Sequence, residues 1–119
     1  MKVLILEDDY LRHKVFKENL IGHVYTICTT TKSLIQNLET DIWDYLFLDH
    51  DLNGQVYVPS GKDTGYEVAE WIVDHPERRP KRIIIHSFNE EGVENMSKLL
   101  QTAVVFPGAW KYVTQILGS

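Results

Sequence analysis

The sequence has a single cysteine, no long apolar run and fewer basic than acidic residues. With Cys28 alone, no disulfide can form within the chain, and a reducing compartment such as the cytoplasm is expected. No apolar run approaches the roughly 20 residues that span a bilayer, so no membrane association is expected. The 12 Lys and Arg against 17 Asp and Glu give a formal charge of -5. That charge disfavours non-specific binding to nucleic acid.

What is present is typical of one globular domain over residues 1–119, with 44% hydrophobic and 24% charged residues. Short apolar segments alternate with amphipathic ones. Strands are predicted at residues 2–6, 23–29, 45–48, 81–87 and 102–106. The helices between and after them are predicted from apolar residues at helical spacing: Leu11, Val15, Phe16 and Leu20; Leu34, Ile35 and Leu38; Val68, Trp71 and Ile72; Val93, Met96, Leu99 and Leu100; Trp110, Val113, Ile116 and Leu117.

This alternation predicts an α/β fold of the (βα)5 type, a parallel sheet with helices on both faces. One connection, residues 53–63, is longer than the others, and such loops are often functional. Thr64 followed by Glu67 matches a capping box, so a helix is expected to begin there.

Acidic residues and histidines follow three of the predicted strands. Because ligands bind at the carboxyl ends of parallel strands, these side chains are expected to share one pocket. Carboxylates without nearby cysteine favour Mg²⁺ or Mn²⁺, although the histidines would also suit Zn²⁺. Asp9 has an alternative role as a helix cap. The predicted metal ligands are Glu7, Asp8, Asp49 and Asp51.

The segment after the fourth strand suggests a phosphate site. Ser87 and Asn89 precede a helix whose free N–H groups favour an anion, although Asn89 could simply cap that helix. Arg12 could reach the phosphate or be a solvated surface residue. His50 and His86, with Asp49, are the candidate catalytic groups. The alternative for each histidine is a structural role with satisfied hydrogen bonds.

The chain resembles a receiver domain, the phospho-acceptor module of two-component response regulators. Glu7 and Asp8 match the acidic pair of that family, Asp49 matches its phospho-acceptor aspartate, and Ser87 matches its hydroxyl residue. The resemblance implies a flavodoxin-like three-layer sandwich with strand order 2-1-3-4-5. The sequence departs from the family at Phe106, where receivers carry a lysine that pairs with the phosphorylated aspartate.

Four segments together resemble a narrower family, the cyclic-phosphate-processing receiver-like domains: "ILEDDYLRHKVF", "LFLDHDL", "TGYEVAEWI" and "IIIHSFNEEGVENM". This resemblance implies a metal-dependent pocket that binds or hydrolyses the cyclic phosphate of a nucleotide or an RNA end. A metal-dependent phosphoesterase is therefore one expectation. The alternative is a stand-alone two-component receiver phosphorylated on Asp49, which Phe106 disfavours.

Overall fold

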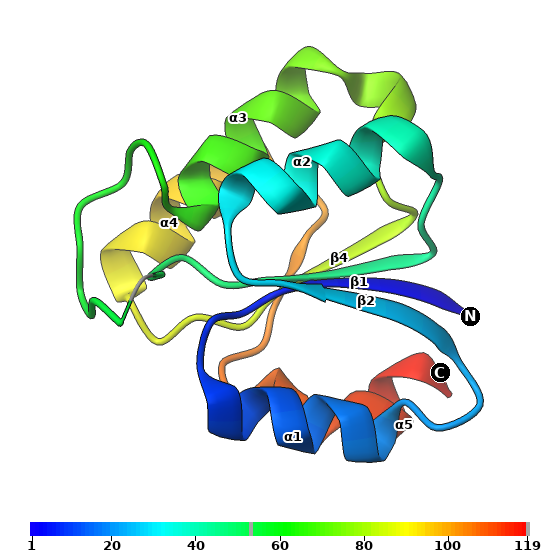
Figure 1. The fold of residues 1–119 in the computed structure, drawn as a ribbon. Coiled ribbons are helices and arrows are strands. Elements are labelled where there is room, and N and C mark those ends of the chain that lie inside the picture. Colours follow the sequence, from blue (N-terminus) through cyan, green and yellow to red (C-terminus); the bar gives the residue numbers. More distant parts are fainter. Residues whose placement is uncertain (53, 119) are drawn as a thin grey trace.

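The computed structural model describes residues 1–52 and 54–118, and its centre is a five-stranded parallel sheet. The strand order is β2-β1-β3-β4-β5, which confirms the predicted topology (Figure 1). Two residues lie outside the described part of the chain: Asn53, the first residue of the predicted loop 53–63, and Ser119, the last residue of the predicted domain. The strands are β1 (Lys2–Leu6), β2 (Val24–Cys28), β3 (Tyr45–Leu48), β4 (Arg82–Ile85) and β5 (Val104–Val105).

Helices cover both faces of the sheet, with α2, α3 and α4 on one side and α1 and α5 on the other (Figure 1). Two short 3-10 helices, η1 (Pro76–Arg78) and η2 (Ala109–Lys111), lie in the connections. No helix of residues 1–52 and 54–118 is both long enough and apolar enough to cross a bilayer. The cytoplasmic location stays a prediction. The α-helices are α1 (Tyr10–Asn19), α2 (Thr31–Thr40), α3 (Gly65–Asp74), α4 (Glu90–Leu99) and α5 (Val113–Leu117).

The strands alternate their side chains between two separate cores, as the pleat of a strand requires. On the side of α2, α3 and α4, the core contains Leu4, Leu6, Leu46, Leu48, Ile83 and Ile85. On the side of α1 and α5, it contains Val3, Ile5, Tyr45, Phe47 and Ile84. This parity continues past the strand ends and decides to which side each polar residue turns.

Several local predictions need correction. Leu11 is 73% exposed, because the first turn of α1 lies at the carboxyl edge of the sheet. Strand β5 starts only at Val104, since Thr102 takes a φ of 79° that ends extended structure. The last predicted helix is divided into η2 and α5. Thr64 caps α3, but the Glu67 carboxylate accepts from the Asp63 N–H rather than completing the capping box.

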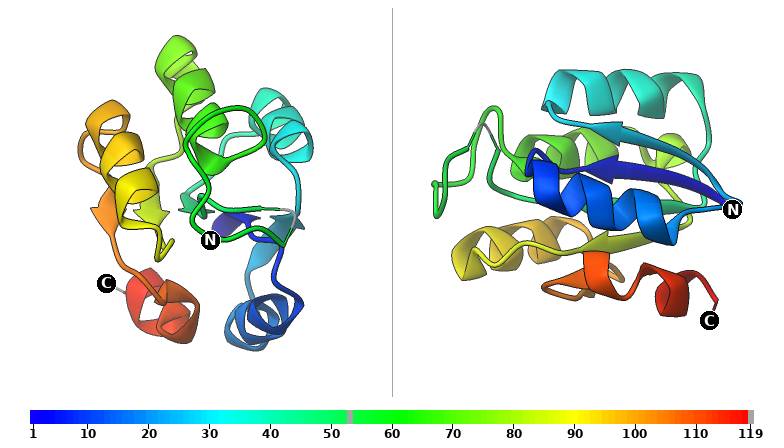
Figure 2. Two further views of the ribbon diagram at one scale, coloured as in Figure 1. Left: turned by 90° about the vertical axis from the view of Figure 1, so that its left-hand side faces the viewer. Right: turned by 60° about the horizontal axis from the view of Figure 1, so that its bottom comes forward.

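The carboxyl ends of the strands and the β3–α3 loop lie at one end of the molecule, and both termini lie at the other (Figures 1 and 2). At the loop end, α3 begins in direct contact with the segment that follows β3. The Gly65 N–H donates to the His50 carbonyl at 2.9 Å. A Cβ at Gly65 would lie 1.8 Å from the Asp49 carbonyl oxygen, so only glycine allows this approach.

Candidate functional site

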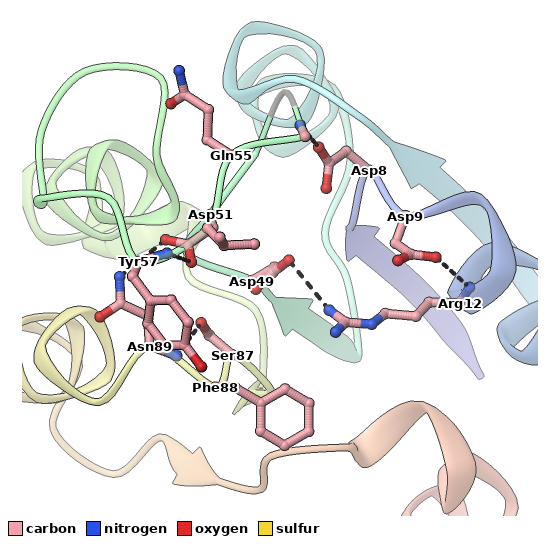
Figure 3. A pocket seen from close by; sticks show the side chains of 12 residues that line it. Asp8, Asp9, Arg12, Asp49, Asp51, Gln55, Tyr57, Ser87, Phe88 and Asn89 are labelled. Carbon is pink, nitrogen blue, oxygen red and sulfur yellow. Dashed lines mark hydrogen bonds and ion pairs between the residues drawn. The ribbon is translucent and has the colours of Figure 1, made fainter.

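A cavity of about 360 Å³ opens at the carboxyl edge of the sheet (Figure 3). This volume lies within the usual range of small-molecule sites. Three of the predicted site residues, Glu7, His50 and His86, are fully buried and are not among those that line the cavity. The predicted residues that line it are Asp8, Arg12, Asp49, Asp51, Ser87 and Asn89.

Asp49 forms the floor of the cavity and is only 4% exposed. Its Oδ1 accepts the His50 backbone N–H at 2.8 Å. Burial raises the pKa of Asp49 to about 7; the negative charge of Glu7 adds to the rise, whereas His86 opposes it. An ionised Asp49 is therefore costly here unless a further positive charge enters the cavity.

Glu7 lies beside Asp49 and is bonded at all of its acceptor positions. Its Oε2 accepts the backbone N–H groups of Asp8 and Asp9, each at 3.1 Å. Its Oε1 contacts His86 Nε2 at 3.0 Å and Arg12 Nη1 at 3.3 Å. Burial alone would raise the pKa of Glu7, but these partners lower it to about 2. A carboxylate offers about four acceptor positions, so Glu7 has little capacity left for a metal.

Arg12 supplies positive charge at the cavity wall. Its Nη1 is 3.9 Å from Asp49 Oδ2 as well as 3.3 Å from Glu7 Oε1. The guanidinium lies over the Trp110 ring, 4.2 Å from its centroid, a cation–π geometry that fixes its direction. Asp9 caps α1 by accepting the N–H groups of Leu11 and Arg12, so its capping alternative is confirmed.

His86 takes part in the same buried network from the side of α1 and α5. Its ring has edge contacts with Phe16 and Trp110, and Nε2 bonds Glu7. Within the described part of the chain, Nδ1 has no hydrogen-bond partner. Phe106, which stands at the position of the receiver lysine, packs against the Tyr112 ring. Arg12 and His86 therefore contribute the basic side chains next to Glu7, in a chain without the receiver lysine.

His50 turns to the opposite side of the sheet and is held by protein groups at both ring nitrogens. Nδ1 lies 2.8 Å from Asp51 Oδ1, and Nε2 lies 2.9 Å from Ser60 Oγ. Because a carboxylate only accepts, Nδ1 carries a proton and donates it to Asp51. The ring also fills the space above Gly92, where a Cβ would be 2.4 Å from it. This placement fits the structural alternative and does not bring His50 to the cavity.

Asn89 and Asp51 are also largely committed to internal bonds. Asn89 Oδ1 accepts the Gly92 N–H and so caps α4, which confirms the capping alternative. Asn89 Nδ2 donates to Asp51 Oδ1 at 3.0 Å and to the Val58 carbonyl at 2.9 Å. Asp51 Oδ2 accepts the Tyr57 N–H at 2.7 Å. Ser87 lines the cavity, and its Oγ accepts the Asn89 N–H at 3.1 Å.

Two sets of residues could hold a cation. The ligand atoms of Glu7, Asp49 and His86 lie within 4.8 Å of one another in a buried cluster. On the open side, Asp8 and Asp49 face the cavity, and Asp8 Oδ2 accepts the Gly54 N–H of the loop at 2.8 Å. We favour the open side, because Glu7 and His86 already bond each other. Of the four predicted ligands, Asp8, Asp49 and Asp51 line the cavity, but both oxygens of Asp51 already accept hydrogen bonds.

Sequence reasoning missed four residues that shape the site: Tyr57, Ser60, Gly92 and Trp110. Only Gly92 left a signal, as a glycine inside a helical pattern, where a close packing contact is the usual reason. The contacts of the other three span 6 to 98 residues of sequence, so no helix or strand spacing indicates them.

We expect replacement of His50 by alanine to destabilise the fold by about 2–4 kcal/mol, because it empties a buried space and removes one hydrogen-bond partner each from Asp51 and Ser60. Ser60→Ala is the matched control and should cost about 1 kcal/mol, since it removes one bond of the same ring. Urea unfolding of the two variants measures both. A stable His50→Ala protein that had lost only ligand affinity would contradict the structural role.

The comparisons with known proteins agree with this geometry. A family model described as "Cyclic-phosphate processing Receiver domain" matches residues 3–102. A search of curated proteins gave no match. The similar solved structures include response regulators. The phosphorylated cyanobacterial phytochrome response regulator RcpA has a TM-score of 0.74 at 18% identity, covering 98% of this chain and 87% of that one.

Two further similar structures contain a divalent metal ion. The Mn²⁺-bound form of response regulator Rcp1 has a TM-score of 0.74 at 17% identity, covering 97% of this chain and 90% of that one. TrrA from Thermotoga maritima, in complex with Mg²⁺-BeF, has a TM-score of 0.69 at 16% identity, covering 98% and 96%. At such identities the likeness shows the fold alone.

Proposed function

This chain belongs to the family of cyclic-phosphate processing receiver domains, and from that premise we propose that its cavity binds a divalent cation together with a cyclic phosphate. The ligand would be a nucleotide or an RNA end that carries such a phosphate. One observation above all supports this. Asp49, at the floor of an open cavity, has its pKa raised to about 7 beside a second, ionised carboxylate. Such a perturbed pair in a cleft is a typical mark of a functional site.

The accessible donors fit Mg²⁺ or Mn²⁺. Asp8 and Asp49 offer carboxylate oxygens, the ligands that hard divalent cations prefer. Glu7 and Asp51 are not proposed as direct ligands, since their own oxygens are already bonded. When bound, the cation would neutralise the carboxylates and polarise a phosphate oxygen. Related folds bound to Mn²⁺ or Mg²⁺ support the same choice of metal.

The phosphate would be held by Arg12, in α1, and Ser87, between β4 and α4, which both line the cavity. The planar fork of Arg12 suits two phosphate oxygens, and Trp110 holds it in place. Ser87 offers a hydroxyl at the entry to α4, whose N-terminus favours an anion. His50 and His86 act as positioning residues, since neither lines the cavity.

A thermal-shift comparison tests this proposal. Cyclic nucleotides are added with and without Mg²⁺ or Mn²⁺, and ligands that bind the folded state raise the melting temperature. The largest rise is expected with cation and cyclic phosphate together, reduced in Arg12→Gln and Ser87→Ala. Chromatography of the same mixtures separates binding from hydrolysis. If no combination raises the melting temperature of the unsubstituted protein, the proposal is wrong.

Phosphorylation of Asp49 is the second candidate function, favoured by the position of Asp49 at the floor of a receiver fold. We expect acetyl phosphate with Mg²⁺ to leave most of the protein unmodified, because Phe106 packs on Tyr112 and brings no lysine to Asp49. Intact-mass measurement detects the adduct. A high-yield adduct that Asp49→Asn abolishes would instead assign the chain to phosphosignalling.

A further inference from the structure

Two exposed aromatic side chains line the same cavity and are not used by the proposed cation and phosphate sites. Tyr57, in the β3–α3 loop, is 72% exposed, and Phe88, after β4, is 51% exposed. Figure 3 shows their rings on one side of Asp49, across the cavity from Asp8. Exposed apolar rings gathered at a pocket are typical of a ligand-binding surface rather than of ordinary surface residues.

Specific contacts hold the backbone of Tyr57 and the ring of Phe88. The Tyr57 N–H donates to Asp51 Oδ2 at 2.7 Å, and its φ of 55° is a left-handed conformation that bulky residues rarely adopt. Phe88 packs against Trp110 with centroids 5.5 Å apart and planes at 80°. The Arg12 guanidinium lies 5.6 Å from the Phe88 centroid. The β3–α3 loop and the segment after β4 thus present two aromatic side chains at the cavity that Arg12, the group proposed to hold phosphate, also lines.

We infer that Tyr57 and Phe88 form the binding site for a nucleobase, so that the ligand of the cavity is a nucleoside cyclic phosphate rather than a base-free one. The inference rests on the proposed function and extends it. Any base offers a flat π face, and stacking on aromatic side chains tolerates all four. A base on these rings would leave its phosphate within the part of the cavity lined by Arg12, Ser87 and Asp49.

A stacking site of this kind predicts an order of affinity among cyclic phosphates. Recognition by stacking, without hydrogen bonds to the edge of the base, depends on the area of the π face. Purine cyclic phosphates should therefore bind somewhat more tightly than pyrimidine ones, and both should bind more tightly than a cyclic phosphate without a base.

Calorimetric titration in the presence of Mg²⁺ tests the inference with three probes: the 2′,3′-cyclic phosphates of adenosine and cytidine, and glycerol 1,2-cyclic phosphate. The nucleotides should bind about tenfold more tightly than the glycerol compound. Tyr57→Ala and Phe88→Ala should remove most of that preference and leave affinity for the glycerol compound unchanged. Phe88→Leu, which keeps an apolar contact with Trp110, should behave like Phe88→Ala. Tyr10→Ala is the control, because Tyr10 is 81% exposed but outside the cavity lining.

Three results would overturn the inference. Equal affinity of the unsubstituted protein for all three probes would mean that no base is recognised, while the proposed function stood. A preference retained in both alanine variants would place the base elsewhere. If none of the three compounds binds, the proposed function itself fails and the inference falls with it.

Discussion

Replacement of Asp49 by asparagine should weaken binding of Mg²⁺ or Mn²⁺ and yet raise the melting temperature above neutral pH. Asp49 is one of four carboxylates that line the cavity and one of the two proposed metal ligands, so its loss removes a direct ligand. Substitution of residues that only support a metal ligand lowers metal affinity by about 10–100-fold. The loss of metal affinity in Asp49→Asn should be at least as large. Asparagine keeps the shape of the side chain but carries no charge, so the repulsion from Glu7 and the cost of burying an ionised group disappear.

The pH dependence follows from the sign of the shift. The pKa of Asp49 is about 7 in the folded protein against the ordinary value of 3.8, so the folded state retains a proton that the unfolded chain releases. Stability therefore falls as the pH rises from about 4 to about 7 and then stays at the lower level. Asp49→Asn should be more stable than the unsubstituted protein by about 2–4 kcal/mol near pH 8, and equally stable near pH 4.

Urea unfolding at both pH values, with metal titration by calorimetry, measures both effects. Asp44→Asn is the control, since Asp44 lies at the other end of the sheet. The hydrogen bond from the Lys2 backbone N–H lowers the pKa of Asp44; slight burial opposes this shift, and Lys81 adds to it. It should gain no stability and should leave metal affinity unchanged. An Asp49→Asn protein that is less stable near pH 8, or that binds metal normally, would contradict the account of the site.

Substitution of Gly65 by alanine should destabilise the protein by about 3 kcal/mol or more. The added Cβ would lie 1.8 Å from the Asp49 carbonyl oxygen and 2.9 Å from its carbon, and both are backbone atoms. Relief of such overlap requires that α3 move away from the segment that carries Asp49 and His50. The same movement would break the bond from the Gly65 N–H to the His50 carbonyl.

Gly61→Ala is the matched control. Gly61 lies in the same β3–α3 connection, four residues before Gly65, and a Cβ there would have no atom within 4 Å. It should change stability by at most about 0.5 kcal/mol. Thermal or urea unfolding compares the two variants. Equal stability of both would show that the contact between α3 and Asp49 is not as close as described.

The fold was predictable because the central strands β1, β3 and β4 are apolar runs that end at polar residues. The two histidines were harder, and strand parity explains why. Ile83 and Ile85 face α2, α3 and α4, whereas Ile84 faces α1 and α5. Continued one residue, this alternation turns His86 to the side of α1 and α5, where Glu7 lies. Period-2 reading of the strands would have found this from sequence alone.

His50 illustrates what the sequence could not show. Parity turns it away from Asp49, but its partners, Ser60 and Gly92, come from the long loop and from α4. Their approach depends on how that loop folds back over the sheet edge, which no local pattern determines. The positions of the acids at the carboxyl ends of the strands identified them correctly as neighbours, whereas burial decides which of them a ligand can reach.

The central claim is that cation and cyclic phosphate bind in one cavity, and calorimetric titration of a 2′,3′-cyclic nucleotide with and without Mn²⁺ tests it most directly. Because each ligand neutralises charge that the other would meet, the two should bind cooperatively, with affinity for the nucleotide raised about 5–150-fold by the metal. Reciprocally, the nucleotide should tighten binding of the metal by the same factor. Equal nucleotide affinity with and without Mn²⁺, or no binding of either ligand, would contradict the account.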